Sequence, residues 1–285
     1  MDDFNDKIAV VTGGGSGMGR EIVRQLAAAG ARVAACDLSM DGLEKTEALV
    51  REDHPDAEIL TFRADVSSET DLEGLRDAVC QTFETEHINL LFNNAGIAGG
   101  GSMFTASRES WERTFDVTWS GVYLGCRVFL PLLAASTEGY VVNTSSVNGF
   151  YASIGPDRPH TAYSAAKFAV KGFTEALMTD LQINAPHVKA AVVMPGHIGT
   201  GIVRNTMRAQ VGEPTPEEAE FLVAAQEMFE TTAPMTAAEA ARVILDGVRA
   251  ERWRILVGDD AVELDEKVRA DPENAYQAGF FTLLG

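Results

Sequence analysis

Short apolar runs rich in β-branched residues alternate along the chain with longer amphipathic segments. The short runs are bounded by turn residues and are predicted to be buried strands, whereas the longer segments repeat apolar residues at helical spacing. The predicted strands are 8–11, 31–37, 58–63, 88–92, 139–144, 189–194 and 254–257. The predicted helices are 21–29, 40–52, 72–83, 111–133, 163–181 and 236–249, with a further helix after residue 215. This alternation predicts an α/β fold, a single doubly wound parallel sheet with helices on both faces, and no linker divides residues 1–285 into separate domains.

A glycine-rich turn, T-G-G-G-S-G-M-G from Thr12 to Gly19, joins the first predicted strand to the first helix. Backbone N–H groups at the start of that helix can face a pyrophosphate. Asp37 ends the second strand, 18 positions beyond Gly19, where an acidic side chain can hydrogen-bond an adenosine ribose. The alternative is that the glycines only build a tight turn. Strand, turn, helix and Asp37 together favour a dinucleotide site.

Polar residues also follow the other predicted strands. Asp65 follows the third strand, Asn93 to Gly96 the fourth, Ser146 the fifth and Pro195 the sixth. Because the carboxyl ends of parallel strands meet at one edge of a sheet, these residues are predicted to border one cleft.

Tyr163 and Lys167 are four positions apart, so a helix places them on one face. A free phenol has a pKa near 10, and a nearby ammonium favours the phenolate. Lys167 can therefore prepare Tyr163 to exchange a proton with a substrate. The alternative for such a pair is a solvated helix face.

Three motifs make the chain similar to a known family. Gly13, Gly17 and Gly19 fit the pattern T-G-x-x-x-G-x-G, residues 93–96 fit N-N-A-G, and Tyr163 to Lys167 fit Y-x-x-x-K. In this order and spacing, residues 5 to 200 resemble the short-chain dehydrogenase/reductase family. The resemblance implies a Rossmann fold and an NAD-dependent oxidoreductase that transfers a hydride between nicotinamide and a secondary alcohol or its ketone.

The resemblance also assigns roles to residues. Tyr163 would be the acid/base, Ser146 would position the substrate oxygen, and Lys167 would lower the pKa of Tyr163 and bind the nicotinamide ribose. The cofactor-binding residues that it implies are Gly13, Ser16, Gly17, Met18, Gly19, Asp37, Leu38, Asp65, Val66, Asn93, Ala95, Gly96, Tyr163, Lys167, Pro195, Gly196, Ile198 and Thr200. In the family the acidic residue at Asp65 contacts adenine, but a helix cap is an equal alternative here. Asp37 would repel a ribose 2′-phosphate and Leu38-Ser39 offer no cation, so we expect NAD rather than NADP.

The chain departs from the family pattern at Thr118, where members carry an Asn that helps to hold a water in the proton relay. Thr118 is therefore a candidate catalytic position at which the relay is rearranged, weakened or absent. This residue is the feature that favours the alternative function, a catalytically weak NAD-binding regulatory protein on the same fold. Tyr163 lies 17 positions after Ser146, about four more than we expect for the family, which predicts a loop bulge within 150–161. His197 is expected to be a solvated residue at the rim of the site rather than a catalytic one.

The segment 201–235 follows the last motif and is predicted to form a helical lid over the substrate, with core packing as the alternative. Thr215-Pro216-Glu217-Glu218 has the form of a capping box and opens a helix with an apolar stripe. Phe150, Tyr151, Phe221 and Met228 suggest a bulky, apolar substrate. The tail 275–285 is too apolar to lie in water, so it is expected to dock on its own subunit or on a neighbour.

Composition restricts the remaining possibilities. The chain has 285 residues, 46% of them hydrophobic, and a net charge of −19, which argues against nucleic acid or an anionic membrane as a partner. No apolar run is expected to approach the length of a membrane-spanning helix, and the acidic N-terminus does not resemble a signal peptide. Three dispersed cysteines suit a reduced, cytoplasmic protein, and the five histidines show no metal-ligand spacing. The family implies a small-molecule alcohol or ketone as substrate and a homodimer or homotetramer, assembled through the helix 111–133 and the helix after Tyr163.

Overall fold

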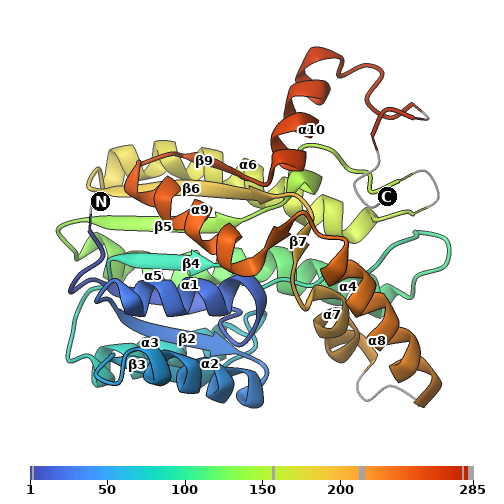
Figure 1. Cartoon of the computed structure of the whole chain (residues 1–285). Coiled ribbons are helices and arrows are strands. Elements are labelled where there is room, and N and C mark those ends of the chain that lie inside the picture. The colour runs from blue at the N-terminus through green and yellow to red at the C-terminus, as the bar shows by residue number, and fades with distance from the viewer. Residues whose placement is uncertain (2, 156–157, 212–215, 278, 282–285) are drawn as a thin grey trace.

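A seven-stranded sheet, all of its pairs parallel, forms the centre of the molecule (Figure 1). The computed structural model describes residues 1, 3–155, 158–211, 216–277 and 279–281. Its strands lie in the order β3-β2-β1-β4-β5-β6-β9. The chain builds outward from β1 to β3, then crosses back to place β4 on the other side of β1. This order confirms the predicted doubly wound sheet and creates a switch point between β1 and β4, where ligands bind in such folds.

The strands of the large sheet are β1 (Ile8–Thr12), β2 (Arg32–Asp37), β3 (Ile59–Arg63), β4 (Leu90–Asn93), β5 (Gly139–Thr144), β6 (Val188–Pro195) and β9 (Arg254–Val257). The small sheet consists of β7 (Ile198–Gly199) and β8 (Met235–Thr236). The helices are α1 (Gly17–Ala28), α2 (Met40–Asp53), α3 (Glu69–Thr82), α4 (Arg108–Phe115), α5 (Gly121–Ala134), α6 (Thr161–Asn184), α7 (Ile202–Val211), α8 (Pro216–Thr231), α9 (Ala237–Arg249) and α10 (Asp259–Ala270). A π-turn (Asp116–Ser120) joins α4 to α5, and a 3-10 turn (Val147–Gly149) follows β5.

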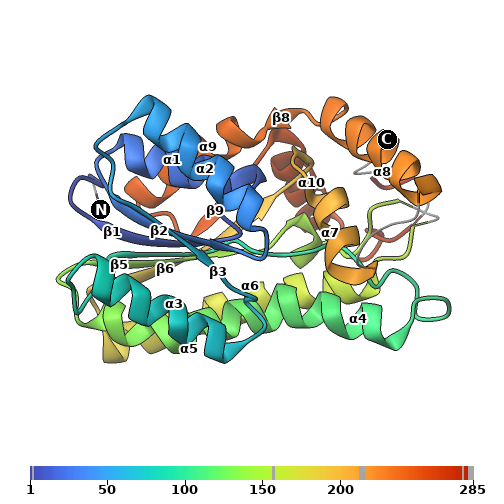
Figure 2. The ribbon, with the colours of Figure 1, turned by 90° about the horizontal axis from the view of Figure 1, so that it is seen from below.

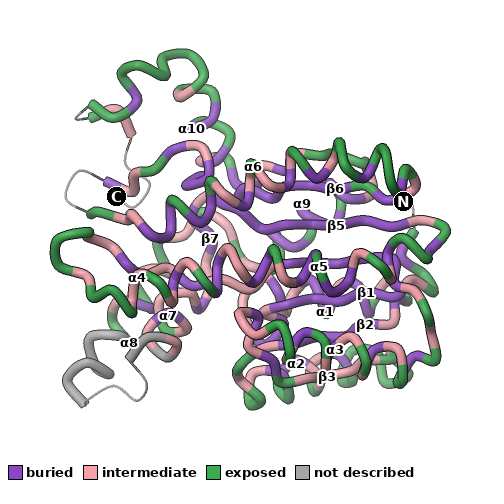
Figure 3. The backbone as a smooth tube through the Cα atoms, turned by 180° about the vertical axis from the view of Figure 1, so that it is seen from behind, coloured by how far each residue is buried: buried purple, intermediate pink, exposed green. Residues whose placement is uncertain are grey.

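Helices cover both faces of the large sheet. Figure 2 shows α1, α2 and α9 on one side and α3, α5 and α6 on the other. Residues 8–11 of β1 are all apolar because both faces of the strand are covered: Ala9 and Val11 enter one core, and Ile8 and Val10 enter the other. The central strands are buried along their length in Figure 3. Helices α7 and α8 lie beyond the end of the sheet at which the strands finish (Figure 1).

The helix predicted over 111–133 is longer and less regular than expected. It runs from Arg108 to Ala134 through the π-turn, and Pro131 lies inside α5 rather than at its end. By length and composition this helix could cross a membrane, so the expectation that no apolar run is long enough was wrong. Half of its most apolar 18-residue stretch is buried inside the protein, as in a core helix that packs against a sheet.

Several elements were not predicted. Strands β7 and β8 are two residues each, too short for any periodicity. Helix α10 begins after Gly258, whose φ is +105°. Most of its residues are charged, and its buried residues are only Ala261, Leu264 and Asp265, so it has no clear apolar periodicity in the sequence. Beyond it, the tail packs on its own chain, since Tyr276 stacks on Tyr151 with ring centroids 5.3 Å apart and Phe280 also contacts Tyr151. Leu283 and Leu284, also expected to dock, lie outside the described residues.

Candidate functional site

A cavity of about 730 Å³ lies at the carboxyl ends of β1, β2, β3 and β4. The structure brings a large share of the predicted cofactor residues to its wall. These are Gly13, Ser16, Gly17, Met18, Asp37, Leu38, Asp65, Val66, Ala95, Gly96 and Thr200. Helix α7 contributes Ile202, Arg204 and Asn205 to the same wall, so the cavity is bounded by the sheet edge on one side and by the predicted lid on another.

The glycine turn is shaped by close backbone approaches. Gly13 has a φ of +69°, a region that side-chain-bearing residues rarely adopt. Gly19 does not line the cavity, but a Cβ there would overlap the carbonyl oxygen of Gly13 and lie 2.6 Å from the Asn94 amide nitrogen. The third glycine of the motif therefore allows helix α1 to start directly against the turn and against the loop that follows β4.

Asp37 is held at the end of β2 with its carboxylate at the cavity wall. Its Oδ2 accepts the Gly15 N–H at 3.1 Å and its Oδ1 accepts the Ser39 N–H at 3.0 Å. The sequence suggested no cation near this position, yet Arg20, Lys45 and Arg63 line the same cavity. They come from α1, α2 and β3, so inspection of Leu38-Ser39 could not find them. Arg63 pairs in register with Asp37.

Asp65 lines the cavity and organises the turn after β3. Its carboxylate accepts hydrogen bonds from Ser67 and pairs with Arg113 at 2.8 Å. Burial alone would raise the pKa of Asp65, but hydrogen bonds from Ser67 and Arg113 bring it below its ordinary value. The N-cap of α3 is Ser68 rather than Asp65. Of the two sequence alternatives, the structure therefore excludes the helix cap at Asp65 itself.

Asn93 does not line the cavity, and its neighbour Asn94 does. The Asn93 side-chain amide donates to Asn143 Oδ1 at 2.9 Å within the core, and a Cβ on Gly125 of α5 would collide with the side-chain Oδ1 of Asn93. Because side chains alternate along a strand, Asn93 points to the α5 layer. The Asn94 amide donates to the Thr12 carbonyl at 3.2 Å, and its Oδ1 is buried with no partner among the described residues.

Ser146, Tyr163 and Lys167 are buried together near the end of β5. Lys167 is only 3% exposed, and its Nζ lies 5.4 Å from the Tyr163 ring centroid and donates to the Thr144 carbonyl at 2.8 Å. Burial lowers the pKa of Lys167 to about 7. Burial raises the pKa of Tyr163 to about 12, and a hydrogen bond with Ser146 acts in the opposite direction. The expectation of a lowered Tyr163 pKa was therefore wrong for this structure, because burial outweighs the lowering effects, and the phenol carries its proton at neutral pH.

Ser146, Tyr163 and Lys167 do not line the cavity, but Lys167 lies next to Gly96, which does. Gly96 lines the cavity, and a Cβ on it would lie 3.4 Å from Lys167 Nζ and 3.8 Å from Thr118 Oγ1. Thr118 is buried in the π-turn, where its hydroxyl donates to the Ile97 carbonyl at 3.1 Å and accepts the Ile97 N–H at 3.3 Å. Thr118 thus fastens the loop that follows β4 beside Lys167.

His160, three positions before Tyr163, is a residue of this group that the sequence motifs do not indicate. Its ring stacks on the Tyr163 ring with centroids 4.6 Å apart and planes 14° apart. Burial lowers the pKa of His160 to about 4, so the imidazole is neutral. The only sequence signal was its helical spacing to Tyr163.

The turn after β6 is tied to α8 rather than open to solvent. The expectation that His197 is solvated was wrong, because it is 6% exposed and its Nε2 lies 2.8 Å from the Phe229 carbonyl. Its N–H donates to Asp260 of α10. The cavity is not lined by Pro195, Gly196 or Ile198, although the sequence predicted them to bind the cofactor. Pro195 accepts from Ser146 Oγ at 3.5 Å, Gly196 donates to Val257, and Ile198 pairs with Met235.

Helices α7 and α8 are fixed to residues of the cavity wall by specific contacts. Asn205 donates to Ser16 Oγ of the glycine turn at 2.8 Å, and Gln226 of α8 donates to the Thr200 carbonyl at 2.8 Å. The predicted apolar stripe of α8 is partly wrong, since Met228 is 59% exposed. Thr215 and the side chains of Phe221 and Leu222 lie outside what the structure describes.

In the described part of the chain, no cluster of three or more His, Cys, Asp or Glu side chains could hold a metal ion.

Similarity to known proteins extends over nearly the whole chain. The profile of the short chain dehydrogenase family matches residues 7–211. The levodione reductase of Leifsonia aquatica is 36% identical over 85% of this chain and 89% of that protein, and SadH of Mycobacterium tuberculosis is 37% identical over 94% of this chain and 92% of its own length. Among solved structures, a short chain dehydrogenase/reductase from Burkholderia phymatum in complex with NAD has a TM-score of 0.83 and 28% identity, and the match covers 96% of each chain. Together with the motifs at the cavity, these matches show that the chain belongs to the short-chain dehydrogenase/reductase family.

Proposed function

We propose that this protein is an NAD-dependent oxidoreductase that interconverts a secondary alcohol and its ketone. The observation that carries the proposal is the buried group of Ser146, Tyr163 and Lys167, whose Lys167 amine lies next to Gly96 in the wall of a cavity that the glycine turn and Asp37 also line. Relatives named levodione reductase and cyclopentanol dehydrogenase support an alcohol or ketone substrate. The related structure in complex with NAD supports the cofactor.

The residues present fit a dinucleotide. The cavity is large enough for most of such a molecule, the start of α1 faces it, and the unpartnered Asn94 Oδ1 offers a buried acceptor. The Asp37 carboxylate would bind the adenosine ribose hydroxyls and disfavour a 2′-phosphate. Lys167 would hold the nicotinamide ribose near Gly96. When bound, the nicotinamide supplies or accepts the hydride.

The proton chemistry belongs to the chain itself. With its pKa raised to about 12, Tyr163 holds a proton that it can give to a ketone oxygen during reduction, and it takes that proton back during alcohol oxidation. Ser146 would hydrogen-bond the same oxygen and fix its position. Segment 201–235 would close over the substrate as a lid, because α7 and α8 already contact Ser16 and Thr200.

An absorbance assay of reduced nicotinamide tests the proposal. Wild-type protein is mixed with NAD or NADP and a panel of bulky secondary alcohols, and the reverse reaction is run with the corresponding ketones. We expect turnover with NAD and at least tenfold less with NADP. No turnover on a broad panel, with NAD still bound, would contradict the proposed activity.

An Asp37→Ala variant tests the basis of cofactor choice. Removal of the carboxylate takes away the repulsion of a 2′-phosphate and leaves Arg20, Lys45 and Arg63 at the wall. We therefore expect the NAD-to-NADP ratio of kcat/KM to fall by about tenfold or more. An unchanged ratio would show that Asp37 does not set the preference.

A Thr118→Asn variant distinguishes an active enzyme from the regulatory alternative. The Thr118 hydroxyl already serves both backbone groups of Ile97, so we expect kcat to change by less than about threefold. A large gain in kcat would instead show that threonine impairs catalysis in the native chain and would favour a binding role. Thermal unfolding of both proteins controls for loss of the Ile97 contacts.

We also propose a homodimer or homotetramer assembled through α5 and α6. Static light scattering of the purified protein measures this directly, and a monomeric mass would contradict it.

A further inference from the structure

One part of the cofactor cavity wall combines a carboxylate with apolar side chains. Asp65 lines the cavity just after β3, and its neighbours Ala64 and Val66 line it too. Leu38, which also lines the cavity, lies close by, because the Ala64 N–H donates to the Asp37 carbonyl at 3.1 Å. Apolar side chains favour a flat heterocycle, and an ionised carboxylate favours a hydrogen-bond donor on the edge of that heterocycle.

Three acceptor positions of the Asp65 carboxylate are used within the chain. Its Oδ1 accepts the Ser67 N–H at 2.9 Å and the Ser67 hydroxyl at 2.6 Å. Its Oδ2 accepts a hydrogen bond from Arg113 Nη2 at 2.8 Å. An ionised carboxylate offers about four acceptor positions and no donor. The described contacts therefore leave about one position on Oδ2, which can accept a donor from the cavity.

Arg113 fixes the direction of this carboxylate. While its Nη2 binds Asp65, its Nη1 donates to the Ser67 hydroxyl at 2.7 Å. One planar guanidinium thus holds the carboxylate and also the residue that binds its other oxygen. The Arg113 and Asp65 side chains are only 28% and 26% exposed, so solvent screens this pair less than a pair on the open surface. Arg113 is not among the described residues that line the cavity, so it acts on a ligand through Asp65.

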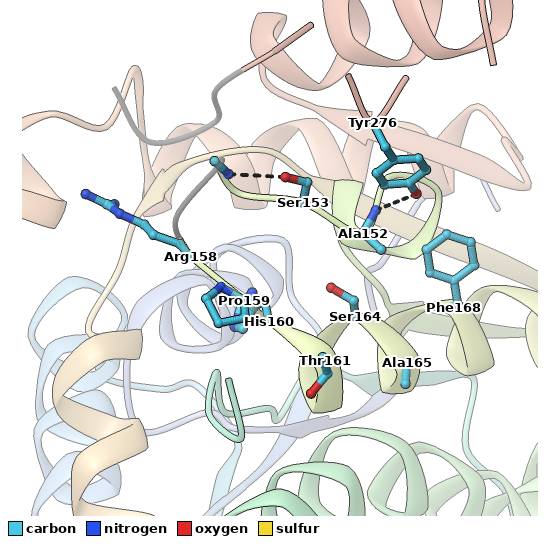
Figure 4. Close-up of a pocket in the computed structure, with 11 residues that line it drawn as sticks. Ala152, Ser153, Arg158, Pro159, His160, Thr161, Ser164, Ala165, Phe168 and Tyr276 are labelled. Atoms are coloured by element: carbon cyan, nitrogen blue, oxygen red, sulfur yellow. Dashed lines mark hydrogen bonds between the residues drawn. The ribbon is translucent and has the colours of Figure 1, made fainter. Parts of the chain in front are cut away.

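The helix that carries Arg113 is anchored on both sides of this residue. Two positions earlier, the Trp111 indole donates to Thr161 Oγ1 at 3.1 Å. Thr161 lies on the first turn of α6, as Figure 4 shows, two positions before Tyr163. Four positions after Arg113, Val117 lines the cofactor cavity. Arg113 therefore keeps a fixed place relative to the cavity, and so does the carboxylate that it binds.

We propose that Arg113 is a positioning residue that sets the base selectivity of the cofactor cavity. It turns the Asp65 carboxylate so that the position left on Oδ2 accepts the amino group of a 6-aminopurine. A 6-oxopurine presents an oxygen at that place, which the carboxylate repels. The inference rests on the proposed dinucleotide site, but its test needs no turnover.

Calorimetric titration of the full-length protein with NAD and with nicotinamide hypoxanthine dinucleotide tests this role. In the second compound an oxygen replaces the adenine amino group. We expect wild-type protein to bind NAD at least about tenfold more tightly, and this preference to fall below about threefold in Arg113→Ala. Arg113→Lys keeps the charge but loses the planar fork, so its preference should lie between these two. A lysine variant with the wild-type preference would contradict the role even if Arg113→Ala did not fold.

An Asp65→Asn variant shows whether Arg113 acts through Asp65. The asparagine amide offers either a donor or an acceptor to the base, so the preference for NAD should be lost. Adding Arg113→Ala to Asp65→Asn should then change the ratio of the two affinities by less than about twofold, because the carboxylate that Arg113 positions is gone. A larger change in the double variant would show that Arg113 acts by another route.

Arg108→Ala is the matched control, since it removes a positive charge from the same helix. The Arg108 side chain is 88% exposed and pairs with Glu112, and it is not among the described lining residues of the cavity. Its preference for NAD should equal that of wild type. An unchanged preference in Arg113→Ala, an equal loss of affinity for both dinucleotides, or no preference in wild type would overturn the role of Arg113. Wild-type protein that binds neither dinucleotide would overturn the proposed cofactor site as well, so the two failures can be told apart.

Discussion

Replacement of Tyr163 by phenylalanine is expected to lower kcat for ketone reduction by about 1,000-fold. The variant retains the ring that stacks on His160 but loses the hydroxyl that carries the proton. The wild-type phenol is buried and keeps its proton, because its pKa is raised to about 12. Phenylalanine has no acidic hydrogen to donate at that position. Steady-state kinetics in both directions measure the loss, and fluorescence titration should show NAD affinity within about threefold of wild type.

Tyr140→Phe is the matched control for this substitution. Tyr140 is another buried tyrosine, but its hydroxyl donates to the Arg252 carbonyl at 3.1 Å, away from the cavity. Its loss should cost about 1 kcal/mol of unfolding free energy and leave kcat unchanged. If Tyr163→Phe retained more than about a tenth of wild-type kcat, another group would have to transfer the proton.

Replacement of Lys167 by methionine is expected to lower kcat/KM by about 100-fold or more, with a rise in the KM for NAD. Methionine fills a similar volume but cannot donate to the Thr144 carbonyl, as Lys167 does, or to a ribose hydroxyl. It also removes the amine that lies 5.4 Å from the Tyr163 ring centroid. Initial rates over a range of NAD concentrations separate the binding loss from the rate loss.

The same variant should change how stability depends on pH. The folded-state pKa of Lys167 is about 7, below its ordinary value of 10.5, so the folded protein binds fewer protons than the unfolded chain between these values. Stability from this group is therefore lowest below about pH 7 and rises with pH towards 10.5, by up to about 1.4 kcal/mol per pH unit. Urea unfolding at pH 6 and pH 9 should show this rise in wild type and a smaller one in Lys167→Met. Equal slopes would mean that Lys167 is not buried as an uncharged amine.

Local patterns in the sequence determined the sheet and the main motifs of the site. The glycine turn, Asp37 and the pair Tyr163 and Lys167 could all be found because each depends on residues close together in the chain or on the end of a strand. Residues 8–11 of the buried strand β1 are all apolar since each face of the strand meets a helix layer, and that requirement is visible without coordinates.

Contacts between distant segments were decided only by the tertiary structure. The cations around Asp37 come from three elements, and His197 is buried because Phe229 and Asp260 reach it from α8 and α10. The choice of Asn94 over Asn93 at the cavity depends on which face of β4 meets α5. Such features depend on how elements pack in three dimensions, and a linear pattern of apolar and polar residues specifies which face is buried but not which partner covers it.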